Sequence, residues 1–158
     1  MAKLNITIDT REQTPWHFPE WVADTQIGTL HTGDYAISGD AGFAVERKSL
    51  SDFCGTVSSG WERFFREIDR MRDWPAKVVI VEADFESLVF NEEDGELVGP
   101  KHEHYRLTPQ FMMKRIAELT MLGVAVVFAG DREKACALAT AILRERNMEI
   151  NGWEPESE

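Results

Sequence analysis

Two carboxylates and a lysine stand close together in a stretch of sequence that is otherwise typical of short strands. Glu46 follows Asp34 by twelve residues, and Lys48 lies two residues beyond Glu46. Residues two apart on a strand project from the same face, so Glu46 and Lys48 point the same way. If residues 34–38 pair with residues 42–48, Asp34 comes near Glu46 at the end of the sheet.

These residue types at this spacing predict metal-assisted hydrolysis of a phosphodiester. Two neighbouring carboxylates repel each other unless a cation lies between them. Oxygen ligands suit Mg²⁺, which keeps several waters and readily coordinates phosphate. Lys48 can then stabilise an attacking hydroxide or the charge that develops on phosphorus oxygens. The alternative is a solvated hairpin with one ion pair, because three residue types at loose spacing recur by chance.

The elements that must position this trio predict a single α/β domain, a mixed sheet flanked by helices. Period-two alternation marks the first strand, and a nearly continuous apolar run at 77–83 is typical of a strand covered on both faces. The expected strands are residues 4–9, 25–31, 34–38, 42–48, 77–83 and 124–130. The expected helices are residues 49–57, 61–73, 109–122 and 132–146, with Ser49, Thr108 and Asp131 as N-caps. Residues 90–107 read as a polar loop.

Composition is consistent with one compact domain. The chain has 158 residues, of which 43% are hydrophobic, enough to form a core. We expect the domain to span residues 1–147 and residues 148–158 to form an acidic, flexible tail. No apolar run long enough for a membrane span and no secretory signal are visible, so a cytoplasmic location is expected. Cys54 and Cys136 are too few for a disulfide framework, and neither has a nearby histidine that would activate a thiol.

The net charge of −11 argues against strong non-specific affinity for DNA. The acids are unevenly distributed, however. Seven fall in residues 82–96 and four follow Met148, and neither segment contains Lys or Arg. The remainder holds 17 acidic and 17 basic residues, so the body of the domain can carry a local basic face. The charge does not exclude a DNA substrate.

The trio belongs to a longer pattern that resembles the signature of the XPF family of structure-specific endonucleases. "DTRE" at 9–12, "GDY" at 33–35 and "VERKSLSDF" at 45–53 occur in order. The family pattern is Gly-Asp, a spacer, then Glu-Arg-Lys-x-x-x-Asp. The residues that match it are Gly33, Asp34, Glu46, Arg47, Lys48 and Asp52.

The resemblance extends over most of residues 4–146. In "SSGWERFFREIDRM", Arg63, Phe65 and Met71 match the family's next helix, and Glu67 stands where a glutamine is usual. The resemblance implies a restriction-endonuclease-like core and cutting of branched DNA, such as flaps or forks, with Mg²⁺ or Mn²⁺ during repair or recombination. It also implies a homodimer formed through the nuclease domain.

Residue roles follow from the resemblance. Asp34, Glu46 and Asp9 would be metal ligands and Lys48 the catalytic lysine. Arg11 and Glu12 would line the site, with Arg11 also a DNA contact. Further supporting or catalytic residues would be Gly33, Tyr35, Arg47 and Asp52. Arg47 points away from Glu46 and would support the site or hold DNA. Asp52 has an equal reading as a first-turn helix acid, Asp9 can instead accept turn hydrogen bonds, and Glu12 can be a solvated loop acid.

Other candidates have alternatives of equal or greater weight. Arg63, Arg66 and Arg70 share one helical stripe and could contact phosphates, or pair with Glu62, Glu67 or Asp69. The aromatic stripe on the same helix is expected to be core rather than a platform for bases. His102 and His104 are expected to lie in a solvated loop rather than bind metal. Trp16, Phe18 and Trp21 are expected to form a small cluster over the sheet edge rather than stack on bases.

The chain also departs from the family. XPF-type enzymes usually carry a C-terminal tandem helix-hairpin-helix module, and we expect none within these 158 residues. We therefore expect substrate choice to depend on the nuclease domain, on a further protein partner, or on both. The dimer surface is expected on the last two helices, where small and apolar residues also suit packing on the sheet. They are Ala135, Leu138, Ala139, Ala141, Ile142 and Leu143.

Two other functions are compatible with a domain of this type. A non-cutting XPF-like scaffold that binds DNA or a partner would be expected to lose metal ligands, so the presence of Asp34, Glu46 and Lys48 together favours the enzyme. A regulatory protein with an unrelated α/β fold would require all three motif matches to be accidental.

Overall fold

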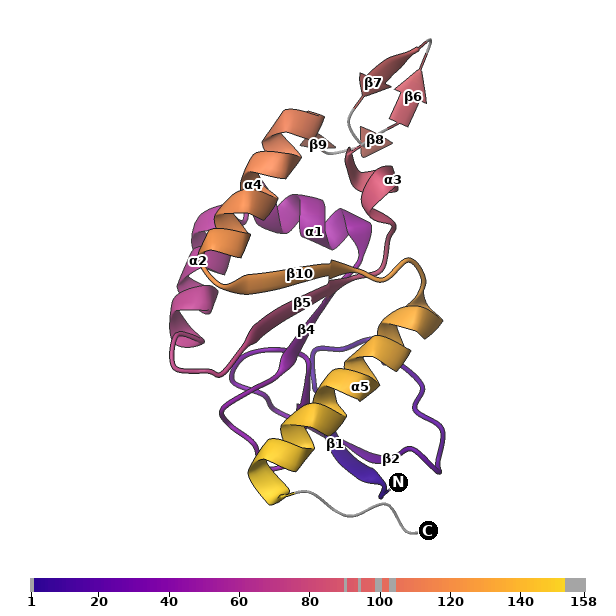
Figure 1. Ribbon diagram of the computed structural model, residues 1–158, viewed down its shortest axis with the longest axis vertical. Helices are drawn as coiled ribbons and strands as arrows, with labels where there is room; N and C mark the ends of the chain where they lie inside the picture. The colour runs from indigo at the N-terminus through magenta and orange to yellow at the C-terminus, as the bar shows by residue number, and fades with distance from the viewer. Residues whose placement is uncertain (1, 90, 94, 99–100, 103–104, 153–158) are drawn as a thin grey trace.

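A mixed six-stranded sheet forms the centre of the molecule (Figure 1). The computed structural model describes residues 2–89, 91–93, 95–98, 101–102 and 105–152. The strand order is β10-β5-β4-β3-β1-β2. These strands are β1 (Leu4–Asp9), β2 (Ala23–Gly28), β3 (Tyr35–Ile37), β4 (Val45–Lys48), β5 (Lys77–Val81) and β10 (Val124–Phe128). Only β3 runs antiparallel to its neighbours, β1 and β4. The predicted mixed sheet flanked by helices is confirmed.

Helices cover both faces of the sheet (Figure 1). On one face lie α1 (Leu50–Val57), α2 (Trp61–Arg70) and α4 (Pro109–Met121), and on the other lies α5 (Arg132–Asn151). Two apolar clusters result. One joins α5 to β1, β3 and β4, and the other joins α1, α2 and α4 to β5 and β10. The strand β5 contributes to both clusters, as its continuous apolar sequence predicts.

The predicted N-caps are present. The hydroxyls of Ser49 and Thr108 accept hydrogen bonds from the amides of Asp52 and Phe111, and the Asp131 carboxylate accepts from Lys134. Each cap satisfies an amide that the first helical turn leaves without a partner. The caps therefore fix where α1, α4 and α5 begin.

The last helix is longer than the sequence pattern predicts. It was expected to end near residue 146, but α5 continues to Asn151 and stops at Gly152, whose φ is +83°. Arg146 forms a pair of hydrogen bonds with the carboxylate of Asp40, at 2.7 and 3.0 Å. Because these bonds tie the helix to the loop after β3, the chain stays helical past Arg146. Residues 153–158 of the predicted tail lie outside the described residues.

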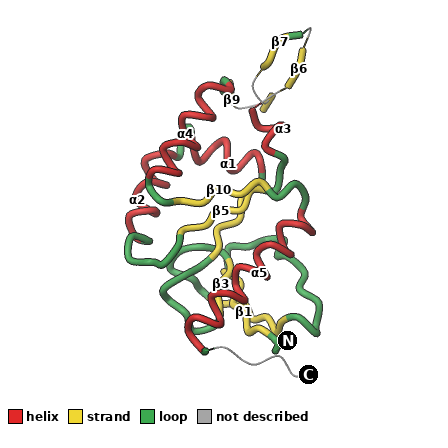
Figure 2. Tube along the Cα trace, in the orientation of Figure 1, coloured by secondary structure: helices red, strands yellow, loops and turns green. Residues whose placement is uncertain are grey.

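The predicted polar loop at 90–107 is only partly irregular. After α3 (Phe85–Val89), the described residues form two short hairpins that project away from the sheet (Figure 2). They are β6 (Asn91–Glu93) with β7 (Glu96–Val98), and β8 (Lys101–His102) with β9 (Tyr105–Arg106). His102 lies in β8, and His104 lies outside the described residues. Within the part of the chain that is described, no helix is both long and apolar enough to cross a membrane.

Candidate active site

The structure brings Asp34, Glu46 and Lys48 together where β3 meets β4. The amide of Asp34 donates to the carbonyl of Val45 at 2.9 Å, and the amide of Arg47 donates to Asp34 Oδ2 at 2.7 Å. Lys48 Nζ lies 3.3 Å from Glu46 Oε1, so the two side chains share a face of β4 as the alternation predicts.

Gly33 allows this close approach of the two strands. Its φ is +87°, and a Cβ at this position would lie 2.5 Å from the Cβ of Ala44. Any other residue would therefore be strained and would also push the strands apart. Gly33 thus sets the distance between Asp34 and the strand that carries Glu46.

Burial makes the two carboxylates difficult to ionise together. Glu46 is 6% exposed, which rules out the solvated-hairpin alternative for this residue. Burial, and then the charge of Glu12, raise the pKa of Asp34 above its ordinary range. Burial and the neighbouring Asp34 raise the pKa of Glu46 further. A cation between the two oxygens would remove both penalties.

The donor set fits a hard divalent cation. Asp34 and Glu46 offer carboxylate oxygens, the ligands that Mg²⁺ and Mn²⁺ prefer, and Mg²⁺ commonly needs only one or two protein carboxylates besides water and phosphate. Among the described residues, no three His, Cys, Asp or Glu side chains are grouped as a metal site. The arrangement is a two-carboxylate site open to further ligands.

Asp9 lies beside the pair, and protein donors already occupy its carboxylate. Its Oδ1 accepts from the amide of Leu30 at 2.9 Å, and its Oδ2 accepts from Nε of Arg11 at 2.6 Å and from the Arg11 amide at 3.2 Å. Burial alone would raise its pKa, but these bonds outweigh it and hold the pKa below the ordinary value. Asp9 thus organises two turns, the alternative that the sequence left open, and is not grouped with Asp34 and Glu46 as a three-ligand site.

Arg47 points to the opposite face of β4 and is almost completely paired there. Its Nε donates to Glu82 at 2.5 Å, and its Nη1 donates to Glu12 at 3.0 Å and to the carbonyl of Thr14 at 2.8 Å. The Tyr35 hydroxyl donates to Glu12 at 2.7 Å. Glu12 is therefore part of a buried network rather than a solvated loop acid, and Arg47 supports β4 from behind.

Glu82 is the partner that sequence reasoning missed. Its carboxylate accepts from Arg47 and also from the indole Nε1 of Trp16 at 2.6 Å, and its amide donates to the carbonyl of Lys48 at 2.8 Å. The available signal was an acid at the end of the apolar run "KVVIVEA". Trp16 and Phe18 form the predicted cluster, whereas Trp21 is 78% exposed and does not join it.

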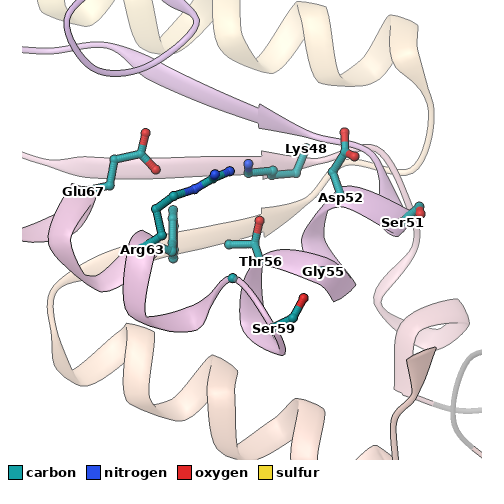
Figure 3. A pocket seen from close by; sticks show the side chains of 10 residues that line it. Lys48, Ser51, Asp52, Gly55, Thr56, Ser59, Arg63 and Glu67 are labelled. Atoms are coloured by element: carbon teal, nitrogen blue, oxygen red, sulfur yellow. The ribbon is translucent and has the colours of Figure 1, made fainter. Parts of the chain in front are cut away.

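A cavity of about 480 Å³ opens next to Lys48, between α1 and α2. Lys48 and Arg63 point toward one another across it, from β4 and α2 (Figure 3). Asp52 and Glu67 also line the cavity. Asp52 is exposed in the first turn of α1, the position that the helix-acid alternative requires. It also lines this cavity.

The three arginines of α2 are exposed and form no ion pair among the described residues. The expected alternative, pairing with acids of the same helix, is therefore absent for Arg63, Arg66 and Arg70. The aromatic stripe behind them is mainly core, as predicted: Phe64 is 3% exposed, although Phe65 is 48% exposed. Arg11 is also largely exposed, with Asp9 as its partner.

Comparison with known proteins identifies the family. A model of the ERCC4 domain matches residues 8–142, which contain all the motif residues described above. The chain belongs to the ERCC4 domain family. ERCC4 domains are nuclease domains, so the resemblance to XPF-type nucleases is confirmed.

A solved structure supports the ERCC4 fold. The chain is similar to XPF from Aeropyrum pernix, with a TM-score of 0.65 and 20% sequence identity. The similarity covers 98% of this chain and 66% of that chain, so this chain spans a little under two thirds of the length of the Aeropyrum pernix chain. The expected restriction-endonuclease-like fold is confirmed. A search of curated proteins finds no match.

Proposed function

We propose that this ERCC4 domain is a divalent-metal-dependent DNA endonuclease. The observation that carries the proposal is the pair of the half-buried Asp34 and the buried Glu46, with Lys48 beside it. Two carboxylates that cost free energy to ionise together, next to a cation, are what a metal-assisted phosphodiesterase requires. Membership of the ERCC4 family supports the reaction class, and the local geometry supports the choice of these three residues.

Each residue of the trio has a distinct task in this reaction. Asp34 and Glu46 would hold Mg²⁺ or Mn²⁺, which when bound polarises the phosphate and lowers the pKa of a water molecule. Lys48 stabilises negative charge on the reacting oxygens. Arg47 holds Asp34 in place through its backbone amide, and Asp9 orders the turn that leads to Asp34.

Branched DNA is the substrate class that we propose, in repair or recombination. The α2 side chains Arg63, Arg66 and Arg70 are exposed and form no ion pair among the described residues. Arg11 is a further cation near the site. Its pKa is raised mainly by Asp9, and in smaller part by the charges of Asp34 and Glu46. Such cations can bind phosphates. The acidic balance of the chain makes recognition depend on this local face, or on a further protein partner.

We also propose that the protein forms a homodimer through α4 and the edge of β10. The predicted surface needs correction, because Ala135, Ala139 and Leu143 of α5 are fully buried against the sheet. The exposed apolar residues lie instead around the end of α4, where Met121 is 86% and Leu122 37% exposed. Among the described strands, β10 beside them lies at an edge of the sheet with no neighbour on its outer side, a surface that a second copy can cover.

Cleavage of a labelled DNA panel tests the proposed activity. The panel contains single strand, duplex, 3′ flap, fork and four-way junction, each with Mg²⁺, Mn²⁺ or EDTA. We expect cutting only with metal, and loss of cutting in Asp34→Asn and Lys48→Ala, while the exposed control Asp24→Asn stays active. Failure of the folded parent to cut any substrate, even with Mn²⁺, would contradict the proposal and favour a non-cutting scaffold.

A further inference from the structure

A second cavity lies on the Asp34 side of the site, and the chemistry proposed above does not use it. Its volume is about 450 Å³, within the range of pockets that bind small ligands. Its walls come from the segment before β3, the loop before β4 and the end of α2 with the turn that follows. Its lining includes Thr32, Asp40, Phe43, Ala44, Arg70 and Trp74.

The position of this cavity connects it with the reaction. Thr32 precedes Asp34 by two residues and Ala44 precedes Glu46 by two, so the wall continues directly into both proposed metal ligands. Arg70 lines this cavity and Arg63 lines the one beside Lys48. Seven residues of helix separate the two arginines by roughly 10 Å, so one strand of DNA can pass along α2 from the first cavity to the second.

The lining suits a nucleotide. Trp74 is half-buried, with its ring 6.2 Å from that of Phe43, and offers an aromatic face of the type on which bases stack. Arg70 is exposed and has no ion pair among the described residues. The acid in the wall, Asp40, is neutralised by Arg146 at 2.7 Å, so it does not repel a phosphate.

Thr32 supplies an observation that the fold does not explain. Thr32 is only 5% exposed, and its hydroxyl oxygen Oγ1 has no hydrogen-bond partner within the described part of the chain. A buried hydroxyl without a partner costs free energy, and such groups are rare. A polar ligand in the cavity would provide the missing partner.

We propose that this cavity receives an unpaired base of the DNA strand that is cut. Trp74 is the stacking platform, Arg70 contacts the adjacent phosphate, and Thr32 bonds the polar edge of the base. The inference rests on the proposed nuclease function and refines its substrate class. Because a paired base must leave its stack to enter such a pocket, the cavity favours substrates with unpaired nucleotides beside the cut.

Walking one abasic site along the unpaired strand of a fork tests this. Binding is measured by fluorescence anisotropy with Asp34→Asn protein, in which we expect cutting to be lost. We expect one or two positions at which removal of the base weakens binding about tenfold. This position dependence should vanish in Trp74→Ala and return in Trp74→Phe. Arg70→Gln should weaken binding equally for every abasic position.

Thr32→Val separates binding from folding. The substitution keeps the side-chain shape and removes a hydroxyl that has no partner, so the protein should fold normally, as checked by circular dichroism and thermal melting. Binding to the intact fork should weaken several-fold, whereas the substitution should not change binding to the fork that lacks the critical base. This variant decides the question if Trp74→Ala does not fold.

The outcomes distinguish the two proposals. Tight binding to the fork with a flat abasic scan would overturn the base pocket and leave the nuclease function intact. Competition by free deoxynucleoside monophosphates as strong as by the fork would assign the cavity to a mobile nucleotide and overturn the strand-bound role. No binding to any DNA by the folded protein would overturn both.

Discussion

The two faces of β4 contrast sharply, although they belong to one short strand. On one face the guanidinium of Arg47 meets two carboxylates and a carbonyl, and its side chain is only 12% exposed. On the other face the carboxylates of Asp34 and Glu46 crowd together, with Lys48 as the nearby cation. Each face holds two carboxylates and one cation, but behind the strand both carboxylates are ion-paired with Arg47. In front of it, within the described residues, only Glu46 is ion-paired, with Lys48.

The contrast separates support from function. A buried network with every group paired specifies one geometry, and here it fixes β4 and the loop at residues 10–16. Carboxylates with strongly perturbed pKa values are found where chemistry occurs. The front face is therefore expected to tolerate neutralisation without loss of fold, and the back face is not.

The largest expected effect is on the front face. Glu46→Gln keeps the shape of the side chain and removes a proposed metal ligand. The rate of cleavage of a DNA that the parent cuts should fall by at least about 10³-fold, as for loss of a group that stabilises the transition state. Melting should show a folded protein. A cleavage rate within tenfold of the parent's at saturating Mg²⁺ would show that Glu46 is not needed for the reaction.

The next effect is on the back face. Arg47→Met leaves the partly buried carboxylates of Glu12 and Glu82 without their cation, and the free energy of unfolding should fall by up to about 3–5 kcal/mol. Urea unfolding measures it. Glu82→Gln, which keeps a hydrogen-bond acceptor for Arg47 and Trp16, should cost less. An Arg47→Met protein as stable as the parent would show that the network does not hold the strand.

The smallest expected effect is a gain in stability, whereas most substitutions destabilise a protein. Because the folded-state pKa of Asp34 is raised, the native protein binds more protons than the unfolded chain as pH rises from about 4, so stability from this group is lost toward neutral pH. Without metal, Asp34→Asn should be more stable than the parent at pH 8, by on the order of 1–3 kcal/mol, and similar to it at pH 4. If Asp34→Asn and the parent are equally stable at pH 8, ionising Asp34 does not destabilise the folded protein.

The local pattern predicted much of this arrangement. Alternation placed Glu46 and Lys48 on one face, and the caps Ser49, Thr108 and Asp131 marked three helix starts. These features depend on neighbours in the chain, which a sequence displays directly. Gly33 was found only through its match to the family motif, and its close approach to Ala44 is a feature of the structure.

What the sequence did not predict depends on distant partners. Glu82 meets Arg47 because β5 pairs in parallel with β4, a register that the strand sequences do not encode. The extension of α5 depends on Asp40, 106 residues before Arg146. The sequence left two roles open for Asp9, because its hydrogen bond from the Leu30 amide requires the turn after β2 to fold over the end of β1. Long-range pairing, not local propensity, decided each of these.

Calorimetric titration with Mn²⁺ and with Mg²⁺, in two buffers of different ionisation enthalpy, tests the central claim most directly. If the front of β4 is a metal site, the metal-free protein should bind the ion with release of protons at neutral pH, because ligand binding must ionise carboxylates whose pKa values are raised. Affinity should increase with pH and be lost in Asp34→Asn, while Asp24→Asn behaves as the parent. Binding that Asp34→Asn leaves unchanged, or no binding by the folded protein, would contradict the account.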